Sequence, residues 1–184
     1  MNTEYINFLI FFKNISKNGG EKMTNSTMPK IILASACVLG MRSAYNGKVS
    51  KRLLNKQWQT NKNYRFIPFC PEQIAGFSTP RPPVEIIGGD GSDVLSGKAS
   101  IITKIGNDVT QQFTDAMDDI FLAVQWVKPD MIVLQQRSPS CSCAGIYDGT
   151  FTHRLIPGDG VVAAYLRHKG YHLVDIMTFN PLCY

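Results

Sequence analysis

Three cysteines of this chain each stand where a short apolar segment ends and a turn begins. Cys37 ends the run IILASAC, Cys70 ends RFIPFC, and Cys141 follows MIVLQQRSPS. The apolar segments are short and rich in β-branched residues, which is typical of strands buried on both faces. In open parallel sheets ligands bind at the edge formed by the carboxyl ends of the strands. The sequence therefore predicts that three thiols gather at that edge and form a soft, incomplete ligand set for a metal.

Apolar residues follow the spacing of strands and of helices in turn along the chain. Short β-branched runs predict strands over residues 31–36, 65–69, 100–104, 131–134 and 173–177. Helical spacing predicts helices over residues 50–61, 108–127 and 159–169, with Ser50, Asp108 and Asp159 at their N-termini. This alternation predicts an α/β fold, in which a mostly parallel sheet forms the middle of a three-layer, Rossmann-like sandwich.

Residues 76–98 are a long stretch without the spacing of a helix. Prolines keep the segment GFSTPRPPVEI extended, and GGDGSDVLSGKA is rich in turn-forming residues. We therefore expect a long ordered loop here, and loops of this length in compact domains are usually functional. A shorter loop is predicted over residues 40–47, which read GMRSAYNG and end in a turn dipeptide.

The length of 184 residues and the hydrophobic content of 44% predict a single folded domain, which we place at residues 28–184. Residues 1–27 are interpreted as a tail, or as an upstream extension of the translated frame, outside the functional domain. Their apolar run, residues 5–12, is too short to span a membrane and lacks the flanks of a signal peptide. Five cysteines, an odd number in a chain of this length, indicate reduced thiols in the cytoplasm.

The net charge of +5 comes from scattered basic residues. No motif of a nucleic-acid reader and no stripe of alternating basic and aromatic residues accompanies them. We therefore expect a small ligand as the partner, rather than a nucleic acid or a membrane. An electron-rich or anionic small molecule would suit this balance of charge.

The spacing of the cysteines restricts the kind of metal site they can form. They are dozens of residues apart, whereas zinc fingers and ribbons use close pairs of ligands and compact ferredoxins use one short run. What remains is a site assembled by the fold, and three thiolates on one 4Fe–4S cluster would leave one iron without a protein ligand. Cys143, in a Cys-x-Cys pair with Cys141, is an alternative third ligand, and Cys183 is expected to play no part.

Polar residues near these cysteines are candidates for the chemistry. Glu72 closely follows the second cysteine and is either a general acid/base beside the metal or a carboxylate at a helix N-terminus. The serines before the third cysteine form a polar turn whose hydroxyls can bind cluster sulfurs or a water. Arg81, between two prolines, is either a substrate clamp or the structural partner of a carboxylate such as Glu85. Tyr45 is a further candidate for substrate binding, with turn formation as the alternative.

The chain resembles, in an ordered series of motifs, the family known as domain of unknown function 523, which includes thiouracil desulfidase. The motifs are SACVLGMRSAYNG, FCPEQIAGFSTPRPPVEI, DVLSGKA, DVTQQF, SPSC, IYDGTFT and IPGDGVVAAYLR. The resemblance implies an α/β domain with an oxygen-sensitive 4Fe–4S cluster on Cys37, Cys70 and Cys141. It also implies that a glutamate and a serine take part in catalysis, and these correspond to Glu72 and Ser138.

The resemblance and the cysteine pattern together lead to one main hypothesis about function. It is the removal of sulfur from a thiolated heterocycle such as 2-thiouracil, which gives the oxo compound and hydrosulfide without net electron transfer. A hydrosulfide acceptor is then a further partner. Two alternatives are a sulfur carrier or binding protein that holds a cluster without turnover, and a structural zinc site with Cys143 or Glu72 as its fourth ligand.

Overall fold

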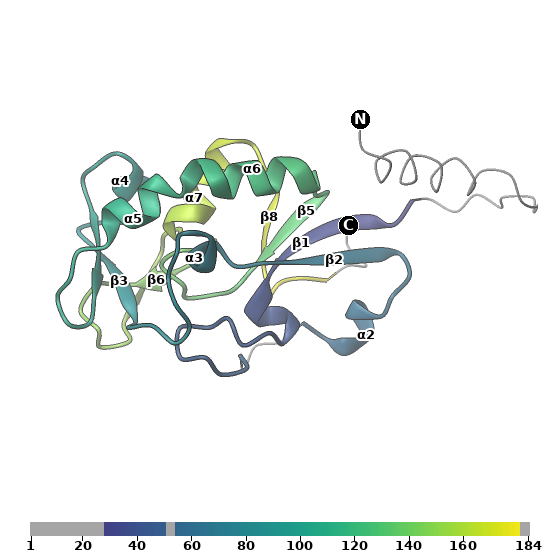
Figure 1. Ribbon diagram of the computed structural model, residues 1–184, viewed down its shortest axis with the longest axis horizontal. Coiled ribbons are helices and arrows are strands. Elements are labelled where there is room, and N and C mark those ends of the chain that lie inside the picture. The colour runs from purple at the N-terminus through teal and green to yellow at the C-terminus, as the bar shows by residue number, and fades with distance from the viewer. Residues whose placement is uncertain (1–27, 51–53, 181–184) are drawn as a thin grey trace, which may run out of the picture.

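The computed structural model describes residues 28–50 and 54–180. The predicted tail, residues 51–53 of the first predicted helix, and Cys183 lie outside the described residues. The main sheet has four parallel strands in the order β2-β1-β5-β8 (Figure 1). Their bounds are β1 Lys30–Ser35, β2 Tyr64–Phe69, β5 Met131–Leu134 and β8 Leu173–Asp175.

Both faces of this sheet are buried, which explains the continuous apolar runs of its strands. Neighbouring residues of a strand point to opposite faces. Accordingly, Leu33 packs in one core cluster with α6 (Met117–Val127) and α7 (Val161–His168). Ile32 and Ala34 pack in a second cluster on the other face, with the helical turn η1 (Ala36–Leu39).

The second face carries much shorter elements than the first. Besides η1, Leu54, Phe179 and Trp58 of α2 (Lys56–Gln59) pack there. The mixed α/β class and the parallel sheet are thus confirmed, whereas the three-layer, Rossmann-like sandwich stays a prediction. Within the described residues, no helix has both the length and the apolar content needed to cross a membrane.

The prediction of a loop over residues 76–98 is wrong for its second half. This part contains β3 (Val84–Ile87) and α4 (Gly91–Leu95). The helix forms despite the surrounding glycines because Asp90 and Asp93 make a reciprocal capping box. The predicted strand near residue 100 exists as β4 (Ser100–Thr103), but it pairs antiparallel with β3 in a separate small sheet.

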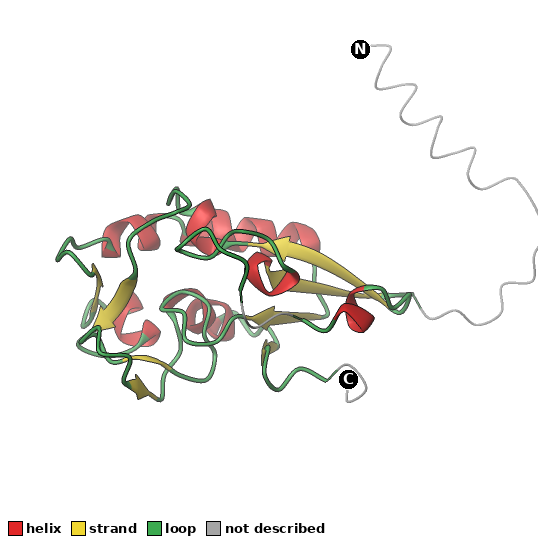
Figure 2. Ribbon diagram, turned by 90° about the horizontal axis from the view of Figure 1, so that it is seen from below, coloured by secondary structure: helices red, strands yellow, loops and turns green. Residues whose placement is uncertain are grey.

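A second small sheet joins β6 (Ile146–Tyr147) and β7 (Leu155–Ile156). The strands of the main sheet run toward the end of the molecule where β3 and β6 lie, so the small sheets extend beyond its carboxyl edge (Figures 1 and 2). The ligand edge expected from the sequence therefore faces the two small sheets (Figure 1).

The predicted helix over residues 108–127 is two helices. α5 spans Thr110–Asp115, and Ala116 separates it from α6, which begins at Met117. The apolar spacing does not reveal the break because Phe113 and Met117 are both buried. Asp108 accepts a hydrogen bond of 2.8 Å from the Thr110 N–H, but the residue before the helix is Val109.

The predicted N-termini of the other two helices are also wrong. α2 begins at Lys56 and is capped by Asn55, which accepts from the Gln57 N–H, rather than beginning at Ser50. α7 is preceded by Gly160, and the carboxylate of Asp159 accepts instead from Arg167, at 2.7 and 3.2 Å. Asp159 therefore pairs with a residue two turns along the helix and does not cap the helix N-terminus.

Candidate functional site

The strand order creates a switch point between β1 and β5. From β1 the chain crosses to β2 on one side, and it later reaches β5 on the other side. Segments that leave the carboxyl ends of these two strands diverge, and this is where open α/β sheets bind ligands. Cys37 lies in η1 directly beyond β1, and Cys141 lies in the turn beyond β5.

The three cysteines and Glu72 interact electrostatically with one another. The pKa of Cys37 is raised to about 12, mainly by burial and then by the charges of Cys70 and Glu72. Burial also raises the pKa of Cys70, and Glu72 adds to the effect. The pKa of the buried Cys141 is raised by burial, and then by Glu72, Cys37 and Cys70. Three segments far apart in the sequence thus bring their thiols to one site.

These raised pKa values have a chemical consequence. Only a thiolate binds a metal, so each of these thiols must lose its proton when a metal centre is loaded. Water provides little stabilisation for three neighbouring thiolates in this buried setting. The site is therefore suited to a positively charged, thiophilic centre that compensates the charge.

Glu72 joins this group from the first turn of α3 (Pro71–Ile74). One carboxylate oxygen, Oε2, pairs with the guanidinium of Arg81. The other, Oε1, accepts from the hydroxyl of Ser140 at 2.7 Å and from that of Ser138 at 3.4 Å. The carboxylate therefore faces the turn that carries the third cysteine, which agrees with both readings of Glu72, as a helix-terminal residue and as a site residue.

The Ser-Pro-Ser-Cys turn is organised around the hydroxyl of Ser138. This oxygen accepts from the N–H groups of Cys141 at 3.1 Å and of Ser140 at 3.3 Å. The Ser140 hydroxyl lies 2.9 Å from that of Ser138 and 3.5 Å from the Cys141 sulfur. The sequence predicted hydroxyls of both serines near the site but assigned a catalytic role to Ser138 alone, so the contact of Ser140 with Glu72 is new.

The N-terminus of α7 holds this turn in place. The N–H of Val161 donates to the carbonyl of Pro139 at 2.8 Å, and that of Val162 donates to the carbonyl of Ser140 at 3.0 Å. The approach requires a glycine before the helix, because a Cβ on Gly160 would stand 2.6 Å from the carbonyl carbon of Ser140. The third cysteine is thus fixed by a main helix of the fold rather than by a free loop.

The partner of Arg81 is Glu72, not Glu85. The carboxylate of Glu85 is buried and accepts from the N–H of Phe151 at 2.9 Å. Tyr45, the other predicted substrate contact, has 49% of its surface exposed, and its carbonyl accepts from the Arg81 N–H at 2.7 Å. The structure therefore supports the structural alternative for Arg81 and leaves the Tyr45 side chain open to solvent.

Cys143 has different surroundings from the three clustered thiols. Burial and the charge of Asp175 raise its pKa to about 11, and Arg167 partly opposes this. Its carbonyl accepts from Arg167 at 3.2 Å. Cys37, Cys70 and Glu72 are not among the main causes of its shift. These electrostatic interactions group Cys141, rather than Cys143, with Cys37 and Cys70.

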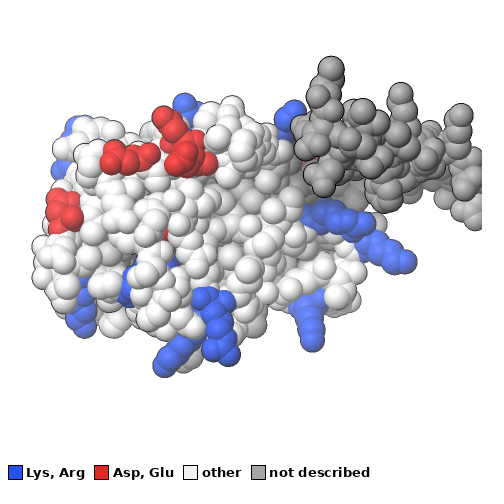
Figure 3. Space-filling model, in the orientation of Figure 1, with Lys and Arg blue, Asp and Glu red and all other residues white. Residues whose placement is uncertain are grey.

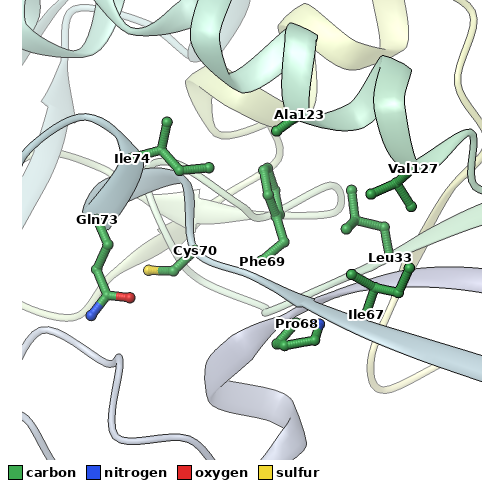
Figure 4. Close-up of a pocket in the computed structure, with 9 residues that line it drawn as sticks. All are labelled: Leu33, Ile67, Pro68, Phe69, Cys70, Gln73, Ile74, Ala123 and Val127. Carbon is green, nitrogen blue, oxygen red and sulfur yellow. The ribbon is translucent and has the colours of Figure 1, made fainter. Parts of the chain in front are cut away.

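A cavity of about 350 Å³ lies beside the second cysteine, between β2, α3 and α6 (Figure 4). In Figure 4 the sulfur of Cys70 points toward Gln73 and away from Leu33 and Val127. The cavity therefore adjoins the thiol site without containing it. Its lining is mostly apolar and consists of Leu33, Ile67, Pro68, Phe69, Cys70, Gln73, Ile74, Ala123 and Val127.

Two further observations concern the charged surface and the arrangement of side chains that could bind a metal ion. On the face shown in Figure 3, lysines and arginines stand apart around the margin and do not form a continuous patch. Among the described residues, no three or more His, Cys, Asp and Glu side chains are arranged to hold one metal ion.

Fold and site together define an α/β protein with three thiols and a carboxylate at the switch point of a parallel sheet. The chain belongs to the 2-thiouracil desulfurase family, whose model matches residues 32–176. This confirms the resemblance drawn from the motifs.

Two relatives illustrate the match. The chain is 38% identical to the uncharacterized protein YbbK of Bacillus subtilis (strain 168) over 152 residues, which are 83% of this chain and 99% of YbbK. Among solved structures, it is similar to the 4Fe-4S-dependent thiouracil desulfidase TudS, with a TM-score of 0.65 and 31% identity. That match covers 80% of this chain and 90% of TudS.

Proposed function

We propose that this protein is an iron–sulfur cluster-dependent desulfidase that removes sulfur from a thiolated heterocycle such as 2-thiouracil. The observation that carries the proposal is the contact among the segments of three cysteines. Glu72, after Cys70, accepts from Ser140, next to Cys141, and the Cys70 sulfur lies 3.9 Å from the Ser43 carbonyl in the loop after Cys37. Membership of the 2-thiouracil desulfurase family supports it, as does the similarity to TudS.

The donor set fits a 4Fe–4S cluster. Three soft thiols, each from a different segment, supply ligands for three irons, and the fourth iron is left without a protein ligand. The electrostatic effects of the thiols on one another support a shared site. Cys37, Cys70 and Cys141 would hold the cluster. When bound, it supplies a thiophilic Lewis acid for the sulfur of the substrate.

The reaction balances as a hydrolysis. The thiocarbonyl carbon loses its bond to sulfur and gains a bond to the oxygen of water, so the products are the oxo compound and hydrogen sulfide or hydrosulfide. No electrons are gained or lost overall. The protein must therefore place a water, take up its proton and deliver a proton to the departing sulfur.

We assign this proton transfer to Glu72. Its Oε1 accepts a proton from the attacking water and later returns it. The hydroxyls of Ser138 and Ser140 lie beside this oxygen and orient the water by their hydrogen bonds. Arg81 holds the carboxylate in place through Oε2. The exposed Tyr45 is proposed to contact the heterocycle, and the hydrosulfide leaves to solvent or to an acceptor in the cytoplasm.

Anaerobic reconstitution with iron and sulfide, followed by incubation with 2-thiouracil, tests the proposal. We expect about four irons per chain and a loss of thiocarbonyl absorbance that depends on Cys37, Cys70 and Cys141. Turnover by an iron-free sample would contradict it. A protein with its full iron content that binds sulfide but forms no product would be a carrier, and about one zinc per chain would indicate a structural site.

A further inference from the structure

Arg81 uses its whole guanidinium group within the protein. Nε and Nη2 pair with Glu72, and Nη2 also donates to the Ser43 carbonyl at 3.0 Å. Nη1 donates to the Ser78 carbonyl at 3.2 Å and to the Thr79 hydroxyl at 3.0 Å. A guanidinium has five N–H donors. These contacts occupy all five, so none is left for a substrate.

The partners of Arg81 belong to the loops of different cysteines. Ser43 and Tyr45 lie in the loop that follows Cys37, and Tyr45 accepts from the main chain of Arg81 at 2.7 Å. Glu72 follows Cys70, whose sulfur is 3.9 Å from the same Ser43 carbonyl. Arg81 thus joins two of the three cysteine segments directly.

The third segment is joined through the carboxylate. Arg81 holds Oε2 of Glu72, and the Ser140 hydroxyl, next to Cys141, donates to Oε1 at 2.7 Å. The two carboxylate oxygens therefore have different partners, Arg81 for Oε2 and Ser140 for Oε1. This leaves the carboxylate a single orientation, because rotation would break both contacts at once.

Burial makes the ion pair selective for arginine. The side chain of Arg81 is 7% exposed and that of Glu72 is 13% exposed. A carboxylate this buried needs a charged partner, and removing one member of such a pair leaves the other uncompensated. A lysine has the charge but offers one point of contact in place of a planar fork, so it cannot reach Glu72, Ser43 and Thr79 together.

We propose that Arg81 is a positioning residue, which fixes the Glu72 carboxylate and sets the spacing of the loops after Cys37 and Cys70 before a cluster is bound. The proposal rests on the function proposed above, in which Glu72 acts on the water. It also assigns substrate contact to groups other than Arg81.

Three variants test this role. Arg81→Lys should lower kcat by about tenfold or more with KM within about twofold of wild type, because orientation is lost while the substrate site stays intact. Arg81→Gln should lower the thermal midpoint of the metal-free protein, since Glu72 is left buried and unpaired. In Glu72→Gln/Arg81→Gln most of this midpoint should be recovered, but not the activity.

Arg154→Lys is the matched control, because the side chain of Arg154 is 77% exposed and lies 3.7 Å from its partner Asp148. It should behave as wild type in every measurement. An increase in KM without loss of kcat in Arg81→Lys would overturn the proposal in favour of a substrate clamp. Absence of thermal coupling between positions 72 and 81 would overturn it too. Inactivity of the reconstituted wild type would contradict the desulfidase function instead, and the thermal coupling would still decide whether Arg81 holds Glu72.

Discussion

Ser140 donates a hydrogen bond of 2.7 Å to the carboxylate of Glu72, although the two residues are 68 positions apart in the chain. Glu72 follows β2 and Ser140 follows β5, and these two strands lie on opposite sides of β1. The contact therefore spans β1, and it brings the general base of the proposed reaction to the turn of the third cysteine.

The two serines of this turn should have different effects on kcat and iron content when each is changed to alanine. Ser140→Ala removes the shorter bond to Glu72 and should reduce kcat by about tenfold with the iron content unchanged. Ser138→Ala also removes the acceptor for two N–H groups, so it should lower both kcat and iron content. Anaerobic kinetics and iron analysis measure this. Ser96→Ala, at an exposed helix end, is the control, and full activity of Ser140→Ala would refute the assignment.

The two cysteines of the Cys-x-Cys pair should also have different effects on iron binding when each is changed to serine. Cys141→Ser should abolish stable iron binding after reconstitution, because it removes one of the three neighbouring thiols. Cys143→Ser should keep the iron content and visible absorbance of wild type, because its neighbours are Asp175 and Arg167. Iron retention in Cys141→Ser together with loss in Cys143→Ser would show that the ligand is Cys143.

The raised thiol pKa values predict how stability depends on pH in the metal-free protein. The pKa of Cys37 is about 12 in the folded chain, against an ordinary value of 9.0. The unfolded state therefore loses this proton first, and stability that is full below pH 9 declines as the pH rises toward 12. Between pH 8 and pH 10.5 the thermal midpoint should decrease less in Cys37→Ser than in wild type. Equal decreases in the two proteins would contradict the raised pKa of Cys37.

The close packing at the start of α7 predicts the effect of one methyl group. Gly160→Ala places a Cβ against the Ser140 carbonyl and should destabilise the protein by about 1–3 kcal/mol. Cluster retention should fall with it, because the turn before Cys141 must move. Denaturant unfolding and iron analysis check both effects. His168→Ala, at the exposed end of the same helix, should change neither, and a Gly160→Ala protein as stable as wild type would exclude the steric argument.

The parallel sheet could be predicted because its inner strands, β1 and β5, are buried on both faces and therefore appear as continuous apolar runs. The thiols could be placed because each follows such a run. By contrast, β3 and α4 are short and stand among prolines and glycines, so the local pattern favoured a loop. The capping box of Asp90 and Asp93 was the signal that could have corrected this.

The contacts around Glu72 could not be predicted from the sequence. Glu85 is four residues from Arg81 and looks like its partner, but β3 directs Glu85 to the Phe151 N–H. Instead, the loop after α3 turns back and brings Arg81 to Glu72, nine residues earlier in the chain. The contact between Ser140 and Glu72 depends on where the segments after β2 and β5 lie in space. The local spacing of residues in the sequence does not determine this.

The switch point also sets an order of events during folding. Each of the three thiols arrives by a separate passage of the chain through the sheet, and the last of them follows β5. A nascent or partly folded chain that lacks one passage offers two thiols at most. A complete set of three thiols therefore requires β1, β2 and β5 to be in place, and the brown colour of a loaded sample would report the formation of this part of the sheet. In a refolding experiment the far-ultraviolet signal should appear before the visible absorbance.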